Sequence, residues 1–205
     1  MKYLLLALML VTTGLQAQIN TEEKALAATL QDGMYAVFET TKGNIICKLD
    51  YEKVPLTVAN FVGLVEGTRN NRLRPTGQPF YDGNTFHRVL PNFMIQGGAV
   101  LNGDGEDIGY KFRDEIDQTL RHNRSGILSM ANAGPATNNT QFFITHVPTP
   151  WLDNKHSVFG SVIAGQYVVD SIAQGDTMLK VRIIRVGKMA KKFDAEKQFK
   201  KLQEQ

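Results

Sequence analysis

The sequence predicts a single, mostly β domain, built as a sandwich or a barrel and decorated with a few helices. Three observations support this fold class. The chain has 205 residues, which is enough for one ordinary domain with a substantial core. Its composition, 42% hydrophobic and 21% charged, is normal for a globular protein. Its apolar runs are short and are separated by Gly and Asn residues, as in β-rich folds.

The first residues are predicted to form a signal peptide. Lys2 is followed by an apolar run from Tyr3 to Val11, and then by small residues that end at Ala17. This order is typical of a secretory signal, and the run is too short to span a bilayer comfortably. We therefore expect residues 1–17 to be removed and the mature chain to be exported to the periplasm or the medium, without a membrane span. An uncleaved membrane anchor is the alternative.

The next segments are expected to form a short helix and a β-hairpin. An N-terminal helical extension should occupy residues 18–33. Two strands, Tyr35–Thr40 and Asn44–Leu49, are joined by a short turn that ends in a glycine. Strand alternation places Cys47 on the same face as its apolar neighbours, so we expect a core role for this thiol.

A helix is predicted to begin at Pro55 and to end at Gly67, which are typical residues for the two ends. Apolar residues between them recur at i, i+3, i+4 and i+7, as expected for one buried helix face. A second helix is expected over Tyr167–Ala173 and a closing strand over Val181–Val186.

Two further segments have no place in the minimal domain. The loop Arg69–Pro79 carries three arginines and is predicted to be solvated. Residues 188–205 contain helix formers and a modest apolar stripe, made by Ala195, Phe199 and Leu202. We expect a helical tail that packs on the domain or is loosely attached, and favour this over a dimerisation helix.

Composition and motifs exclude several function classes. A formal net charge of +3 is too small to argue for nucleic acid or an anionic membrane. A single cysteine allows neither an internal disulfide nor a cysteine metal cluster. The four histidines form no zinc-helix pair, and the sequence has no Gly-rich phosphate loop. We therefore expect no metal and no cofactor.

The segment from Thr85 to Gly98 contains the most informative residues. It places Arg88, Phe93, Met94 and Gln96 within nine residues, with no carboxylate close by. This mixture suits a shallow apolar pocket with one fixed cation and one amide, and does not suit a proton-transfer site. Taken alone, the segment is equally compatible with a buried strand that carries an incidental arginine.

Two later runs favour the pocket. The first run, Ser125–Pro135, contains Ala131 and Asn132, and a polar loop connects it to Gln141-Phe142-Phe143-Ile144. The second run is Trp151-Leu152-Asp153-Asn154-Lys155-His156. Together with the first segment, these runs resemble the cyclophilins, the peptidyl-prolyl cis-trans isomerase family. The resemblance covers about residues 34–187, and its three signatures stand in the family's order at close to the family's spacing.

The resemblance implies an eight-stranded antiparallel closed barrel capped by two helices, here with short helical extensions at both ends. It also implies that Arg88 stabilises the twisted prolyl amide and that Gln96 orients Arg88 or binds the substrate backbone. The expected catalytic set is Arg88, Phe93, Gln96, Asn132 and His156; the expected substrate-binding set is Met94, Ala131, Gln141, Phe143, Trp151 and Leu152. Expected partners are proline-containing polypeptides and cyclosporin-type macrocycles, and we expect a monomer.

Two other function classes remain at this point. One is a binding module or chaperone that holds proline-containing segments in the same groove without catalysis. The other is a serine hydrolase that uses Ser129 or Ser157 with a histidine. The sequence contains no Gly-x-Ser-x-Gly elbow, which argues against the hydrolase.

Overall fold

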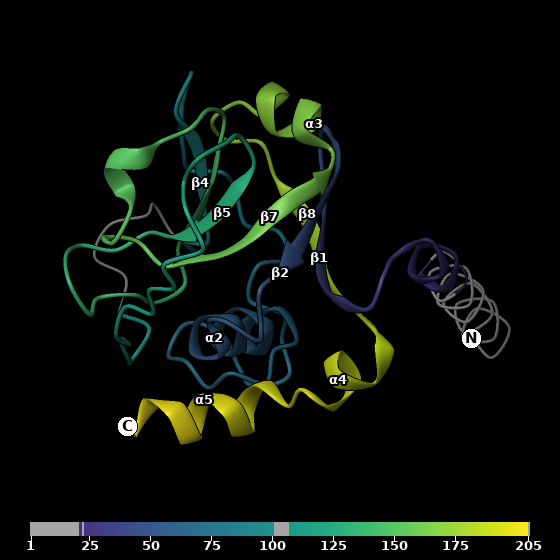
Figure 1. Cartoon of the computed structure of the whole chain (residues 1–205), viewed down its shortest axis with the longest axis vertical. Helices are drawn as coiled ribbons and strands as arrows, with labels where there is room; N and C mark the ends of the chain where they lie inside the picture. Colours follow the sequence, from purple (N-terminus) through teal and green to yellow (C-terminus); the bar gives the residue numbers. More distant parts are fainter. Residues whose placement is uncertain (1–20, 22, 101–106, 205) are drawn as a thin grey trace, which may run out of the picture.

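The computed structural model describes residues 21, 23–100 and 107–204, so the predicted signal peptide lies outside the described part. Eight antiparallel strands form one curled sheet in the order β3-β4-β6-β5-β7-β2-β1-β8 (Figure 1). The strands are β1 Gly33–Thr40, β2 Gly43–Leu49, β3 Arg88–Leu90, β4 Met94–Gly97, β5 Ile127–Met130, β6 Phe142–Thr145, β7 Val158–Ala164 and β8 Met178–Val186. The predicted mostly β fold with eight strands is confirmed.

The helices lie around this sheet. They are α2 Pro55–Val65, the 3₁₀ turn η1 Pro150–Leu152, α3 Gln166–Ser171, α4 Gly187–Lys192 and α5 Ala195–Gln203. Helices α2 and α3 lie at opposite ends of the curled sheet, and α5 lies beyond α2 (Figure 1). Among the described residues, no helix is long and apolar enough to cross a membrane.

The two edge strands, β3 and β8, are joined by a short bridge and not by a continuous ladder. Thr85 and Thr177, which precede these strands, form an isolated antiparallel bridge. Next to it, the N–H of Phe86 donates to the Asp176 carbonyl (2.9 Å), and the N–H of Met178 donates to the Asn84 carbonyl (2.8 Å). The eight strands thus form a curled sheet whose two edges meet at this bridge.

The predicted hairpin and first helix are present. Strands β1 and β2 pair in a register that places Thr40 opposite Gly43, so the turn is tight. Cys47 is fully buried, and burial raises the pKa of its thiol, as expected for a core residue. Pro55 opens α2, and the N–H of Gly67 bonds to the Leu64 carbonyl (3.2 Å) just after the helix ends.

An aromatic cluster fills the space between the sheet and α2. Phe61 of α2 packs against Phe38 of β1, Phe142 of β6, Phe159 of β7 and Tyr81, with ring centroids 5.2–6.0 Å apart. All five rings are buried. Because these contacts join strands from both halves of the sheet, they fix the curvature that positions the groove.

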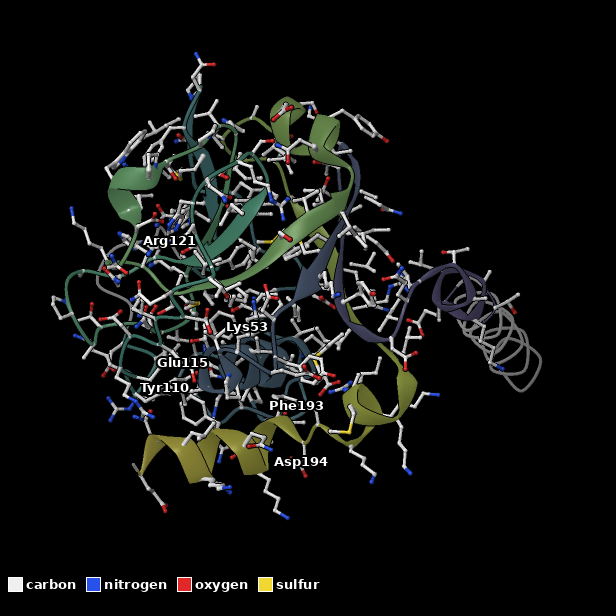
Figure 2. The ribbon with its side chains drawn as sticks, viewed as in Figure 1. Lys53, Tyr110, Glu115, Arg121, Phe193 and Asp194 are labelled. Atoms are coloured by element: carbon white, nitrogen blue, oxygen red, sulfur yellow. The ribbon has the colours of Figure 1, made fainter. Side chains whose placement is uncertain are left out.

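Helix α2 receives its N-terminal cap from a distant loop. The carboxylate of Glu115, which lies close to α2 (Figure 2), accepts the N–H groups of Leu56 (3.1 Å) and Thr57 (2.8 Å). The N–H of Glu115 in turn donates to the hydroxyl of Ser157 (2.9 Å). A negative group at this position satisfies otherwise unpaired N–H groups and complements the helix dipole.

The N-terminal extension packs outside the sheet. Residues 23–29 are helical. Leu26 and Leu30 pack against an outer apolar cluster that includes Tyr35 and Ile184. Glu23 also pairs with Arg182 of β8 (2.8 Å), which ties this helix to the edge of the sheet.

The C-terminal tail packs tightly against the domain as two helices. Phe199 of α5 is buried, and the Arg69 guanidinium lies 3.9 Å from the centre of its ring. Tyr110 contacts the same ring edge-on, and it lies next to α5 in Figure 2. Arg69 also pairs with Glu196 at 2.9 Å. The prediction of a solvated loop is wrong for Arg69, because the tail covers this residue.

Candidate functional site

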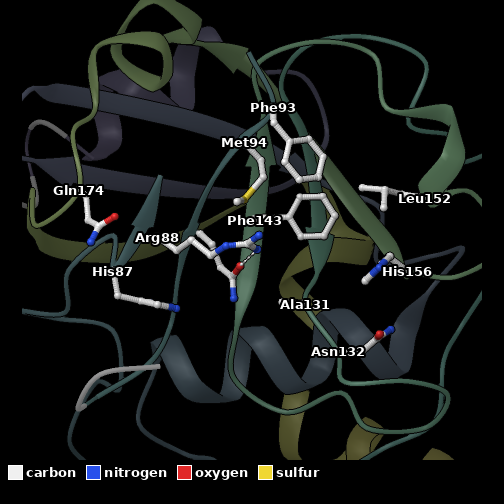
Figure 3. Close-up of a pocket in the computed structure, with 11 residues that line it drawn as sticks. His87, Arg88, Phe93, Met94, Ala131, Asn132, Phe143, Leu152, His156 and Gln174 are labelled. Carbon is white, nitrogen blue, oxygen red and sulfur yellow. Dashed lines mark hydrogen bonds between the residues drawn. The ribbon is translucent and has the colours of Figure 1, made fainter. Parts of the chain in front are cut away.

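A cavity of about 680 Å³ opens on one side of the sheet, where strands β3, β4 and β6 meet the turn η1 (Figure 3). It combines one guanidinium, several apolar side chains and several amides and imidazoles. The lining residues are His87, Arg88, Phe93, Met94, Gln96, Ala131, Asn132, Phe143, Leu152, His156 and Gln174.

Nine of the eleven site residues predicted from the sequence line this cavity, and the exceptions are Gln141 and Trp151. Gln141 lies behind the lining and contacts Gln96, whereas Trp151 is exposed beside Phe93. Sequence reasoning missed His87 and Gln174. His87 directly precedes Arg88 in the motif, so its position was a usable signal; Gln174 follows α3 and gave none.

The β3–β4 hairpin positions the arginine. Asn92 adopts a left-handed conformation (φ 58°) in the turn between the strands. The resulting register places Arg88 directly opposite Gln96. The Nη1 of Arg88 donates to the Oε1 of Gln96 (3.1 Å), and the Nε2 of Gln96 donates to the Oε1 of Gln141 (2.9 Å). This chain of amides orients the guanidinium, which stays exposed at the cavity.

The apolar floor comes from the two neighbouring strands. Phe143 of β6 lies opposite Gln96 of β4, so its ring stands beside the Arg88–Gln96 pair. Met94 and Phe143 are almost fully buried, and Phe93 and Leu152 rise at the sides of the floor (Figure 3). The floor is therefore a narrow apolar recess next to a fixed cation.

At the far end of the cavity, the side chains of Asn132 and His156 are held by hydrogen bonds within the protein. The amide of Asn132 donates to the Lys155 carbonyl (2.8 Å) and to the Asp114 carboxylate (3.3 Å), which engages its side chain internally. The Nδ1 of His156 lies 2.9 Å from the Met130 carbonyl and must donate to it, since a carbonyl only accepts. The His156 ring also meets Phe143 edge-on at 5.6 Å.

A buried hydrogen-bonded chain lies behind the floor. The Nε2 of His122 is 3.0 Å from the Ser129 hydroxyl, and its Nδ1 is 2.9 Å from Asp153 Oδ1. This order of groups resembles a hydrolase triad, but Ser129 and His122 are fully buried, so no substrate can reach the hydroxyl. Ser157 is also buried and accepts the Glu115 N–H. The serine-hydrolase hypothesis is therefore wrong for both serines.

Burial affects the ionisation of this chain. It lowers the pKa of His122, although the nearby Asp153 carboxylate acts in the opposite direction. The hydrogen bonds from the main chain and side chain of His122 lower the pKa of Asp153 despite some desolvation. At neutral pH the chain therefore consists of a neutral imidazole and an ionised carboxylate, and the carboxylate fixes the proton on Nδ1.

Comparisons with known proteins agree with the geometry. Residues 35–190 match the family described as cyclophilin type peptidyl-prolyl cis-trans isomerase/CLD. The chain is 44% identical over 154 residues to peptidyl-prolyl cis-trans isomerase B of Streptomyces anulatus, covering 72% of this chain and 88% of that protein. It is 45% identical over 149 residues to peptidyl-prolyl cis-trans isomerase A of Mycobacterium tuberculosis, covering 69% and 81% of the two chains. The chain belongs to the cyclophilin-type peptidyl-prolyl cis-trans isomerase family.

Proposed function

We propose that the groove accelerates rotation about X–Pro bonds in exported polypeptides and so assists their folding. In this proposal the proline ring rests on the floor made by Met94 and Phe143. Arg88 faces the prolyl nitrogen, and the main chain near Asn132 pairs with the substrate backbone. The observation that carries the proposal is the Arg88 guanidinium, which Gln96 holds directly beside the apolar floor.

The chemistry of the reaction matches this arrangement. Rotation must overcome a barrier of about 18–20 kcal/mol because it breaks amide resonance, and no covalent bond needs to form. The twisted nitrogen regains its lone pair, which a permanently charged guanidinium can stabilise. Among the described residues that line the cavity, none carries a carboxylate or a thiol. We therefore propose a mechanism without a covalent intermediate, in which shape and charge fit the twisted state.

The mechanism is tested by Arg88→Ala in a prolyl-peptide isomerisation assay. A charge-assisted hydrogen bond contributes about 1.5–3 kcal/mol, so we expect kcat to fall about ten- to a hundredfold while peptide affinity changes little. Phe93→Ala should weaken affinity as well as rate, because it removes part of the ring pocket. Arg124→Ala is the control, since this arginine is exposed and lies outside the lining of the cavity.

Circular dichroism must first show that each variant is folded. A folded Arg88→Ala protein that isomerises the peptide at the unaltered rate would disprove the mechanism. The non-catalytic binding module would then be the better explanation of the groove.

Export is a separate part of the proposal. It is supported by the charged, apolar and small-residue order of the segment from Lys2 to Ala17. The intact mass of protein recovered from the exporting host should lack residues 1–17. Recovery of a chain that retains them would refute both the cleavage and the periplasmic or secreted location.

We further propose that cyclosporin-type macrocycles bind the groove and inhibit the enzyme. The support is the exposed indole of Trp151, which lies beside the Phe93 ring in a tilted arrangement (centroids 6.0 Å apart). Inhibition of peptide isomerisation should be lost or strongly weakened in Trp151→Ala. Equal inhibition of both proteins would show that the indole is not part of the binding site.

A further inference from the structure

The turn that carries one wall of the pocket is held at both of its ends by hydrogen bonds to His122. The wall is the segment from Thr149 to Asp153, which contains η1 and Leu152. At its start, the N–H of Thr149 donates to the His122 carbonyl (2.8 Å). At its end, Asp153 Oδ1 accepts both the N–H (2.8 Å) and the ring Nδ1 (2.9 Å) of His122.

The same imidazole supports the floor of the pocket. Its ring stacks on Phe143 with centroids 5.9 Å apart and an interplanar angle of 11°. Its Nε2 bonds to Ser129, which lies opposite Phe143 in the β5–β6 pair. His122 thus contacts the floor through its ring and the wall through Asp153, and both of its ring nitrogens are engaged.

Two further side chains with ionisable groups, Arg121 and His156, lie next to the His122–Asp153 pair and Phe143. The Nη1 of Arg121, a residue labelled in Figure 2, lies 3.6 Å from Asp153 Oδ2 and partly neutralises the carboxylate. His156, from the segment after the wall, meets the Phe143 ring edge-on. The His122 side chain therefore links the wall to the floor directly, through its hydrogen bond to Asp153 and its stacking on Phe143.

We propose that His122 and Asp153 are positioning residues that set the width of the proline pocket by fixing Leu152 relative to Phe143. This inference rests on the proposed function of the groove. Neither residue lines the cavity, so neither touches the substrate. A wider pocket would hold the proline ring less tightly in the ground state and in the twisted state alike. Such a loss of uniform binding raises KM and leaves kcat nearly unchanged.

The test compares Asp153→Ala with Asp153→Asn in the mature protein. The alanine variant releases the end of the wall, whereas asparagine keeps an acceptor for both groups of His122. Asp170→Ala is the matched control, because Asp170 is exposed on α3 and away from the cavity. The readouts are kcat and KM for a prolyl peptide, together with the fluorescence of Trp151, the single tryptophan of the chain. This indole belongs to the wall and contacts the Phe93 ring, so its emission and quenching report movement of the wall.

For Asp153→Ala we expect KM to rise about five- to tenfold, which is less than the full loss of a charge-assisted hydrogen bond would cause, because the Thr149 N–H still holds the start of the wall. We expect kcat to stay within about twofold. The quenching of Trp151 by acrylamide should change in parallel. Asp153→Asn should recover most of the KM and the original quenching, and Asp170→Ala should match the unaltered protein in both. A folded Asp153→Ala protein with unaltered KM and quenching would overturn the proposal. So would a fall in kcat at constant KM, because the unit would then act on Arg88 and not on the pocket.

Two additions keep the test decisive. Should Asp153→Ala not fold, His122→Phe is measured by the same criteria, since it keeps a flat ring against Phe143 and removes the side-chain bond to Asp153. Equilibrium binding of the peptide, measured without turnover, separates this inference from the proposed mechanism. An Arg88→Ala protein with full activity would refute the mechanism, whereas unchanged peptide affinity in Asp153→Ala would refute the positioning role.

Discussion

Phe199→Ala should destabilise the fold strongly while leaving the isomerase site intact. Phe199 is 5% exposed and packs against Phe112, Tyr110 and the Arg69 guanidinium. Truncation of a buried phenylalanine costs about 3–5 kcal/mol, and the loss of the cation–π contact adds up to about 2 kcal/mol where the cation is desolvated. Since about 1 kcal/mol lowers Tm by about 2–4 °C in a chain of this size, we expect Tm to fall by about 6–28 °C.

The assay is thermal unfolding followed by circular dichroism, with activity measured at a temperature where both proteins are folded. At that temperature kcat/KM should stay within about twofold, because none of the residues that line the cavity belongs to α5. Met189→Ala is the matched control, since Met189 lies in α4 and is 65% exposed. This control should change the stability by less than about 0.5 kcal/mol. An unchanged Tm for Phe199→Ala would refute the packing of α5 against the domain.

Deletion of residues 188–205 extends the same reasoning. The deletion removes Glu196, which is the ion-pair partner of Arg69. The Arg69 side chain is only 9% exposed. Breaking a buried ion pair costs about 3–5 kcal/mol, which is an upper limit here because Glu196 is partly exposed. We expect a less stable protein that keeps most of its activity while folded. A loss of kcat/KM above about tenfold in the folded truncated protein, or about 1.4 kcal/mol, would show that the tail supports the site.

Three further predictions concern single contacts. Burial lowers the pKa of His122 from its ordinary value of 6.5, so the unfolded chain binds this proton at a higher pH than the folded one. Stability should therefore fall as the pH drops below about 6.5, and urea titrations at several pH values should show that His122→Phe removes this part of the loss. Gln141→Leu removes the acceptor of the Gln96 amide, and we expect kcat to fall about two- to tenfold in the peptide assay as Arg88 loses its fixed orientation; an unchanged kcat would refute the amide chain. Glu115→Ala uncaps α2 and should cost about 1–2 kcal/mol in denaturant unfolding, with kinetics unchanged in the folded protein.

Local sequence patterns predicted those strands and helices whose formation depends on residues close together in the sequence. The strand alternation around Cys47 and the apolar period between Pro55 and Gly67 both correspond to observed elements. The eight-stranded barrel followed from the resemblance and not from the pattern, because short strands do not specify their partners. The bridge between Thr85 and Thr177 illustrates this, since it joins residues more than ninety positions apart.

The tail shows why a helical stripe can mislead. Read as one helix, residues 188–205 have a weak stripe because Phe193 and Met189 fall to one side of it. The chain in fact breaks at Phe193, where the backbone is extended, and the Asp194 side chain caps the new helix by accepting the Lys197 N–H (3.0 Å). Phe193 then contacts Tyr51, while Phe199 of α5 covers Arg69. Each half of the tail has its own packed face, so a single period underestimates both.

In the site, the contacts within a motif could be predicted from the sequence, whereas the contacts that support the motif from elsewhere in the chain could not. Arg88 and Gln96 lie on adjacent strands of one hairpin, so their contact could be anticipated from a single short segment. His122 reaches Ser129 seven residues later and Asp153 thirty-one residues later, and nothing around a lone histidine indicates either partner. These contacts depend on where β5 pairs with β6 and where the chain turns at η1. A substrate-contacting residue can therefore be inferred from its motif, whereas the residue that holds it in place becomes visible only when the strands have been assembled.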